Sequence, residues 1–444
     1  MKTKNYEIND SMVPWIGDIP NHWNIIRMKQ VCSIVGRIGF RGYTTEDLVD
    51  EGEGPITLSP SNIVDNKLTL KKCSYISWEK YEESPEIQIS YGDIIIVKTA
   101  SVGKCAIYNS NDIATINPQL ALLKDVKCNK SYLYYLICSD VIQIPIKLSN
   151  FGSVVPTITQ HDFMGYSIPL LPPSEQTAIA AYLDEKCAAI DEIIAEAKAS
   201  IEEYKAWKAS VIFEAVTKGL DPTAEMKDSG VPWIGKVPKR WGVCKTLFGL
   251  SMPITDGPHT TPELYETGVP FISAEAVSCG NGKIDFSHMR GYISEDFYNE
   301  CCKKYIPRIN DIYMIKSGAT TGKVAIVDTD KRFTIWSPLA VFRADLKMVV
   351  PKYLFYYLQS YAYLKQVEME WSYGTQQNIG MRVLEQLKIC LPPLFEQSAI
   401  ASYLDDKCAA IDNVIAEKEA LIADMELYKK SLIFECVTGK RKVC

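Results

Sequence analysis

Two stretches of the chain carry apolar residues at steps of mostly three and four, the spacing that places side chains on one face of a helix. Each pattern ends near a glycine, Gly219 or Gly439. We therefore predict two helices of roughly 40 residues, about 60 Å long each. The residues expected on their pairing faces are Ile179, Leu183, Ile190, Ile194 and Ile201 in the first helix and Ile400, Leu404, Ile411, Ile415 and Leu421 in the second.

A long helix with one narrow apolar stripe gains most of its stability by burying that stripe. Each predicted helix is the obvious partner of the other. An antiparallel pair would form a coiled-coil-like rod with a globular domain near each end, in a molecule with pseudo-twofold symmetry. The alternative is two separate helices that each pack on their own domain.

The regions that precede the helices are rich in aromatic, β-branched and turn residues, a composition typical of short strands. The expected fold class is therefore α+β, with two mixed, β-rich domains separated by the long helices. The strand candidates are Ile94–Lys98, Cys105–Tyr108, Leu120–Leu123, Ile312–Ile315, Val324–Val327 and Ala340–Arg343.

The sequence repeats at both ends of each domain. Residues 13–23 read VPWIGDIPNHW and residues 231–241 read VPWIGKVPKRW, and similar helix segments begin LPPSEQTAIAAYLDEK at Leu171 and LPPLFEQSAIASYLDDK at Leu391. Solenoid units are only roughly 20–50 residues long, so this repeat is a duplicated module. The stretches between the matching ends share turn and strand signals but differ in content, which indicates one operation performed on two different inputs.

Charge is unevenly distributed along the 444 residues. The net charge is −6, and 23% of the residues are charged. Residues 175–220 contain nine acids and five bases, and residues 396–438 contain nine acids and four bases, which leaves the rest of the chain at +3. The acidity therefore lies in the repeated helices and does not exclude a nucleic-acid partner for the divergent domains.

Other features of the whole sequence argue against a membrane, secreted or metal-binding protein. No apolar run is long enough for a membrane span, and the N-terminus has no apolar signal segment, so we expect a cytoplasmic protein. The 14 cysteines include no Cys-x-x-Cys pair, and the four histidines lie apart from any cysteine cluster. We therefore expect reduced thiols and no metal site.

Polar, glycine-containing loops in both domains are candidates for contact with DNA. Glycine lets a backbone approach a ligand closely, while Arg, Lys, Gln, Asn, Ser, Thr and His side chains can bind base edges and phosphates. A simple turn is at least as good an interpretation for any single residue. The candidates are Arg37, Arg41, Tyr43, Lys98, Lys104, Ser153, Thr157, His259, Thr260, Thr261, Lys316, Thr320, Lys323, Thr375, Gln376, Gln377 and Asn378.

No motif in the chain indicates catalysis. GATTGK at Gly318 resembles a phosphate-binding loop but has one residue too few between its glycines, and Val324 follows the lysine where that loop needs Ser or Thr. The Asn/Asp-Pro-Pro-aromatic tetrapeptide of base methyltransferases is absent, and so is a glycine-rich cofactor loop after a strand. We therefore predict no catalytic residue and no cofactor in this chain.

Taken together, the motifs resemble those of the specificity subunits of type I restriction-modification systems. The resemblance rests on the two VPWIG segments, the turns at Gly92 and Asn310 before a strand, the TDGPHTTP loop at Thr255, the GTQQNI loop at Gly374 and the two LPP helix segments. It covers essentially the whole chain. One departure is GSVVPTIT at Gly152, where the family usually has a glutamine-bearing loop.

The resemblance implies two target recognition domains, each reading one half of a split, asymmetric DNA sequence. It also implies antiparallel helices that set the distance between half-sites and dock two modification subunits, which carry S-adenosylmethionine and methylate adenine N6, together with restriction subunits. The implied divisions are domain 1 at 1–170, helix 1 at 171–220, domain 2 at 221–390, and helix 2 with a basic tail at 391–444. A stand-alone methyltransferase or endonuclease, and a scaffold that binds protein or sugar, remain the alternatives.

Overall fold

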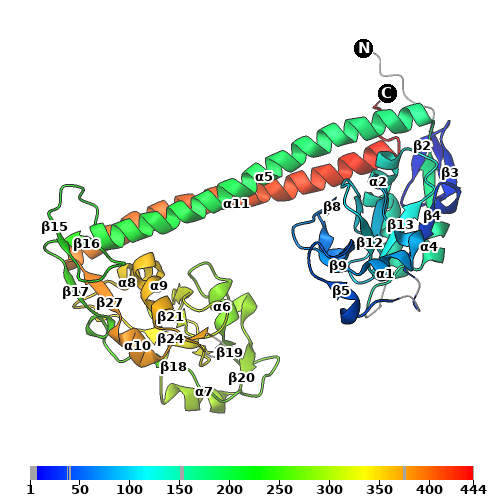
Figure 1. Ribbon diagram of the computed structural model, residues 1–444. Helices are drawn as coiled ribbons and strands as arrows, with labels where there is room; N and C mark the ends of the chain where they lie inside the picture. Colours follow the sequence, from blue (N-terminus) through cyan, green and yellow to red (C-terminus); the bar gives the residue numbers. More distant parts are fainter. Residues whose placement is uncertain (1–7, 38, 40–41, 151–154, 374–376, 444) are drawn as a thin grey trace. The chain divides into compact units, whose positions relative to one another are not determined.

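The computed structural model describes residues 8–443 except 38, 40, 41, 151–154 and 374–376. The chain forms two compact units, Met1–Lys198 with Glu419–Cys444, and Ala199–Lys418 (Figure 1). Each unit contains one globular domain and part of both long helices. We call residues 8–170 the first domain and residues 221–390 the second domain. The units divide inside the helices, whereas the limits predicted from sequence lie at the helix ends.

The first domain is built around the sheet β11-β10-β13-β4, beside a second sheet, β12-β6-β9-β5. Its central strand β10 reads IIIV and is buried at every position, which explains the uninterrupted apolar run. The strands are β1 (Ile8–Asp10), β2 (Asp18–Pro20), β3 (Asn24–Arg27), β4 (Ser33–Val35), β5 (Leu48–Val49), β6 (Ile56–Leu58), β7 (Ile63–Val64), β8 (Lys67–Leu68), β9 (Ser74–Ile76), β10 (Ile94–Val97), β11 (Cys105–Ile107), β12 (Ala114–Ile116), β13 (Leu120–Lys124) and β14 (Ser167–Leu170). The helices are α1 (Trp78–Glu82), α2 (Lys130–Cys138), α3 (Asp140–Ser149) and α4 (Gln160–Gly165).

The second domain repeats this plan with the sheet β18-β24-β21-β22 and the smaller sheet β20-β19-β23. The six strands predicted from sequence are confirmed to within one residue at either end. The strands are β15 (Met226–Asp228), β16 (Lys236–Pro238), β17 (Gly242–Lys245), β18 (Thr255–Asp256), β19 (Val269–Ile272), β20 (Gly291–Ile293), β21 (Ile312–Ile315), β22 (Val324–Ile326), β23 (Thr334–Ile335), β24 (Leu339–Phe342), β25 (Ser372–Tyr373), β26 (Gln377–Asn378) and β27 (Lys388–Leu391). The helices are α6 (Ala274–Ser278), α7 (Glu295–Cys302), α8 (Pro351–Gln359), α9 (Tyr361–Met369) and α10 (Met381–Gln386).

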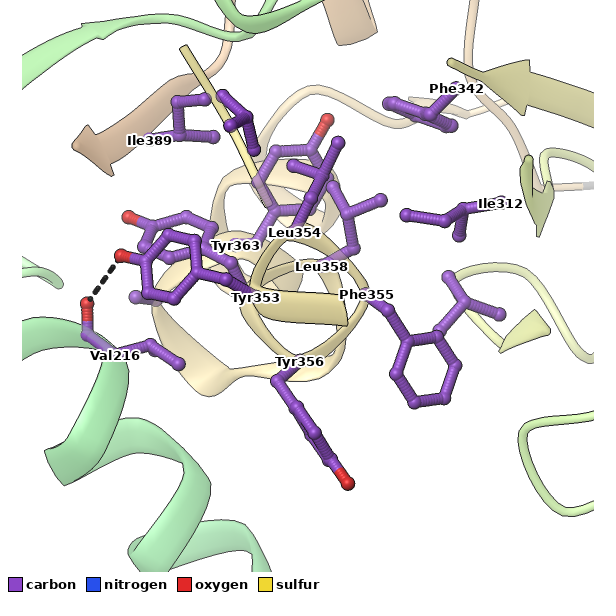
Figure 2. Packing of buried hydrophobic residues seen from close by; sticks show 14 of the residues in the cluster. Val216, Ile312, Phe342, Tyr353, Leu354, Phe355, Tyr356, Leu358, Tyr363 and Ile389 are labelled. Carbon is purple, nitrogen blue, oxygen red and sulfur yellow. Dashed lines mark hydrogen bonds between the residues drawn. The ribbon is translucent and has the colours of Figure 1, made fainter. Parts of the chain in front are cut away.

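Helix α8 lies at the centre of the second domain's core (Figure 2). The side chains of Leu354 and Leu358 are fully buried in the same cluster as Ile312 of the sheet. The hydroxyl group of Tyr353 donates to the carbonyl oxygen of Val216, 3.2 Å away, at the end of the first long helix. The core of the domain and the end of that helix are therefore one packed structure.

The two long helices are α5 (Pro173–Lys218, 46 residues) and α11 (Leu394–Val437, 44 residues). Both are longer than predicted. Helix α5 begins at the second proline of its LPP motif, and α11 begins at the residue that follows the second proline of the other LPP motif. In the second unit, the Lys208 ammonium binds Asp412 at 2.7 Å, and Lys418 lies over the ring of Tyr204. Sequence numbers thus rise along one helix while they fall along the other, which confirms the predicted antiparallel pairing within this unit.

The predicted apolar faces lie against protein, with one correction. Residues from both helices share the core of the first unit, Ile190 and Ile194 from α5 with Leu432 from α11. Leu421, by contrast, is 39% exposed and does not lie on the pairing face, where Ile422 packs instead. The predicted α+β class, with two repeated domains and two long helices, is confirmed. No helix in the described part of the chain has the length and apolar character needed to cross a bilayer.

Candidate nucleic-acid interface

The repeated VPWIG segments attach each domain to the start of its long helix. The indole N–H of Trp23 donates to the Glu175 carboxylate at 2.9 Å, and that of Trp241 donates to Glu396 at 3.1 Å. Both tryptophans are buried, so this hydrogen bond satisfies a donor that has lost water. The tryptophan of the VPWIG segment and the glutamate of the LPP helix segment therefore recur together because they form a hydrogen bond in each copy.

The glutamine that follows each of these glutamates is also a structural partner. Gln176 accepts from the backbone N–H of Asn129 at 2.8 Å, and Gln397 accepts in the same way from Val350 at 2.7 Å. Each of these N–H groups belongs to the N-cap residue of a helix that packs in the core of its domain, α2 or α8. The motif thus joins that helix to the long helix in both copies.

The turn at Gly92 and Asn310 places a buried carboxylate beside the central strand. Both residues have positive φ, +81° and +71°, a conformation that glycine and asparagine tolerate best. The next residue is a buried aspartate in each copy. Asp311 receives two hydrogen bonds of 2.7 Å from the Arg343 guanidinium, and Asp93 pairs with the Lys124 ammonium.

The strand-end lysines, Lys98 and Lys316, lie at equivalent positions just after the central strands β10 and β21. Lys98 accepts a backbone hydrogen bond from Ile158 at 2.8 Å, and Lys316 accepts the equivalent bond from Ile379 at 2.9 Å. Bridges between Thr99 and Thr157, and between Ser317 and Asn378, extend both contacts. The structure therefore brings together predicted DNA-contact residues that are about 60 positions apart in sequence.

Around Lys316, the second domain carries a cluster of charged groups centred on Asp256, which is 1% exposed. The Lys304 ammonium donates to Oδ1 of Asp256 at 2.5 Å. Oδ2 accepts no well-aligned hydrogen bond, but Nζ of Lys316 lies 3.3 Å from it and Nε2 of His259 lies 3.2 Å from it. Burial raises the pKa of Asp256, and the two lysines more than reverse this, so the pKa is lower than usual.

Arg37 has a different position from the one expected of a base-reading residue. Its side chain is 5% exposed, and Nε donates to the carbonyl oxygen of Ile116 at 3.2 Å. The guanidinium lies over the ring of Tyr43, 5.2 Å from its centre, and burial lowers the pKa of Arg37. In this conformation Arg37 and Tyr43 support the loop rather than present themselves to a ligand, and their contact with DNA stays a prediction.

The other candidates are mostly on the surface. Lys104, Thr157, His259, Thr260, Thr261 and Lys323 are exposed, Thr320 is half-buried, and Asn378 is exposed. Nζ of Lys323 lies 3.4 Å from the carbonyl oxygen of Ser278, at the edge of a cavity of about 510 Å³. Arg41, Ser153, Thr375 and Gln376 lie outside the described residues, and only the backbone of Gln377 is described.

Sequence reasoning missed Asp256 and Lys304 as members of the second domain's cluster. Asp256 stands inside the TDGPHTTP loop, so an acidic residue beside candidate DNA-contact residues was a usable signal. Lys304 lies 48 residues farther along the chain, after α7, and nothing in its neighbourhood indicated this contact. Within the described residues, no group of His, Cys, Asp and Glu is arranged to hold a metal ion.

Comparison with known families identifies the family of this chain. The family described as "Type I restriction modification DNA specificity domain" matches residues 20–203 and 258–422, most of both units. The chain belongs to this family. The specificity-domain resemblance inferred from the motifs is therefore confirmed.

Relatives of this specificity-domain chain match along most of its length. The type I restriction enzyme MjaX specificity subunit of Methanocaldococcus jannaschii is 27% identical over 443 residues, 96% of both chains. The MjaVIII specificity subunit of the same organism is 26% identical over 81% of both chains. The EcoBI specificity subunit of Escherichia coli is 22% identical over 72% of this chain and 67% of its own.

A solved structure supports the fold of the specificity-domain chain. It is described as "Structural basis underlying complex assembly and conformational transition of the type I R-M system". The matched chain has a TM-score of 0.68 and 18% identity, and the match covers 95% of this chain and 99% of that one. At this level of identity the likeness establishes a shared fold.

Proposed function

We propose that this chain is the DNA-recognition subunit of a type I restriction-modification complex in the cytoplasm, and that it supplies no catalytic residue. Each domain would read one half of a split, asymmetric target. Two modification subunits, carrying S-adenosylmethionine, would dock on the long helices and methylate adenine N6, and restriction subunits would join them. The observation that carries the proposal is that both domains have the same attachment to the helices but different side chains at equivalent strand ends.

Exchange of one domain tests this proposal most directly. Replacing residues 1–170 by those of another family member should change one half of the methylated motif and leave the other half and the gap intact. Methylation would be mapped across the genome of cells that contain the modification subunits. A change in both halves would contradict the assignment of one half-site to each domain.

We further propose that the helix pair fixes the gap between half-sites, as dimer geometry does in other DNA-binding proteins. The segments between the two ion pairs, Asp191 to Lys208 in α5 and Asp412 to Lys429 in α11, are equally long. Deleting about two heptads from each, roughly 21 Å of helix, should shorten the gap by about six base pairs or abolish binding. An unchanged gap would show that the helices are not the ruler.

The alternative of a stand-alone methyltransferase makes a different prediction. Purified chain incubated with labelled S-adenosylmethionine and DNA should transfer no methyl group, and transfer should appear when modification subunits are added. Methyl transfer by the chain alone would overturn the proposed role.

A further inference from the structure

Gly36 and Asp256 occupy the same place in the two domains. Val35 of β4 pairs with Leu122 of β13, and Thr255 of β18 pairs with Val341 of β24. The last residue of each central strand, β10 or β21, pairs with a residue of β13 or β24. Leu122 and Val341 each lie two residues after that partner, so they are equivalent. Gly36 and Asp256 each directly follow one of these paired residues, Val35 and Thr255, and are therefore matched in register.

In the first domain, this position has no side chain, and the strand-end lysine reaches toward it. A Cβ atom built on Gly36 would lie 3.3 Å from Nζ of Lys98 and 3.2 Å from Nε2 of Gln160. Among the described residues, no carboxylate forms an ion pair with Lys98. Lys98 is half-buried, no acid in the described part of the chain compensates its charge, and burial lowers its pKa.

In the second domain, the same position holds a carboxylate that faces the equivalent lysine. Nζ of Lys316 is 3.3 Å from Oδ2 of Asp256, and the Lys316 side chain is only 12% exposed. Lys304 shares the same carboxylate. Two ammonium groups and one carboxylate thus occupy a place where the first domain has one uncompensated ammonium group.

We infer that this position, Gly36 in the first domain and Asp256 in the second, is a specificity-determining site that decides whether the strand-end lysine is free to bind DNA. With glycine, the lysine presents its charge to an electron-rich acceptor, a phosphate oxygen or the N7 and O6 edge of guanine. With aspartate, the carboxylate holds the lysine, and the exposed His259 and neighbouring threonines are left to contact the DNA. The inference rests on the proposed DNA-recognition function.

The position can be exchanged with little steric cost. Gly36 does not have a positive φ, and the atoms that a new side chain would meet first are the ends of two flexible side chains. Gly36→Asp would therefore recreate the second domain's ion pair at Lys98. Gly36→Asn is the matched control, because it adds almost the same volume without the charge.

The experiment measures binding of the full chain, assembled with modification subunits, to a duplex that contains the methylated target, over a series of salt concentrations. Gly36→Asp should weaken binding about tenfold, as expected for one lost contact. If the lost contact is to a phosphate, the slope of log K against log salt should also fall by about 0.9, whereas loss of a guanine contact should change the slope much less. Gly36→Asn should weaken binding much less. Lys98→Met should match Gly36→Asp, and Lys316→Met should have the smaller effect.

The outcomes separate the inference from the function on which it rests. If the unaltered complex does not bind its target, the proposed function fails. If it binds, and Gly36→Asp equals Gly36→Asn in affinity and slope, the inference is overturned while the function stands. Should Gly36→Asp fail to fold, as judged by its melting curve, the comparison of Lys98→Met with Lys316→Met decides, and equal effects would overturn the inference.

Discussion

The two domains agree where they meet the long helices and differ where their central strands end. At the helices, the contact of Trp23 with Glu175 is repeated by Trp241 with Glu396, nearly atom for atom. At the strand ends, Lys98, which pairs with no carboxylate among the described residues, corresponds in the other domain to Lys316, which is held by Asp256. Attachment to the helices thus fixes a geometry that both copies need, whereas the strand ends are free to differ with the DNA that each copy reads.

The largest expected effect tests whether the attachment is equivalent in both copies. Trp23→Ala and Trp241→Ala each remove a buried indole ring, 6% and 1% exposed, and should each cost about 3–5 kcal/mol of unfolding free energy. Hydrogen exchange should show the loss of protection mainly in the unit that carries the substitution. Trp207→Ala is the control, because its side chain is 50% exposed. Equal loss of protection in both units would contradict two independent attachments.

The buried acid beside the central strand should distinguish the copies. Asp311 is 1% exposed and binds both ends of the Arg343 guanidinium, so Asp311→Asn should cost about 3 kcal/mol by leaving a buried charge unpaired. Asp93→Asn should cost less, because Lys124 makes a single contact with Asp93, whereas Arg343 donates two hydrogen bonds to Asp311. Chemical unfolding of both variants checks this order. A larger loss for Asp93→Asn would show that the lysine pair is the stronger one.

Sequence patterns predicted the elements far better than the contacts of the site. The central strands and long helices were readable because apolar runs and three-to-four spacing report burial directly. The pairing of Lys304 with Asp256, and the burial of Arg37, depend on how distant loops fold over the sheet. Exposed loops carry no such periodic signal, so residue type alone marked both Lys98 and Lys316 as candidates without showing that their surroundings differ.

The helix pair offers a pH-dependent comparison between the units. Asp191 binds Lys429 and Lys67, each at 2.6 Å, whereas Asp412 in the second unit binds Lys208. Burial raises the pKa of Asp191, but the two lysines more than reverse this, so its pKa is lower in the folded state. The stabilisation is therefore present above the unfolded pKa of about 3.9 and is lost as pH falls through the lower folded value.

Asp191→Asn should accordingly lower the stability of the first unit by about 1 kcal/mol at neutral pH and remove this part of its acid sensitivity. Melting curves recorded by circular dichroism between neutral pH and pH about 3 would measure both effects. Asp412→Asn is the matched variant for the second unit. If Asp191→Asn keeps the full acid sensitivity of the unaltered chain, another carboxylate is responsible.

The smallest expected effect concerns the turn before the central strand. Gly92→Asn places in the first domain the residue that the second domain tolerates at φ of +71°, and should cost well under 1 kcal/mol. Gly92→Ala should cost about 1–2 kcal/mol, because alanine pays the steric penalty of positive φ without a polar side chain to offset it. Thermal unfolding of the two variants gives the comparison. Equal costs would show that space, not backbone conformation, selects the residue here.

The end of α11 has a consequence for how the protein is made. Leu432 and Val437 share a core with Ile16 and Trp23, and the Lys440 ammonium donates to the carbonyl oxygen of Ile16 at 2.5 Å. The first domain therefore completes its core with a segment that lies 424 positions later in the chain. Until α11 has been translated, Ile16 and Trp23 lack the part of their core that Leu432 and Val437 supply.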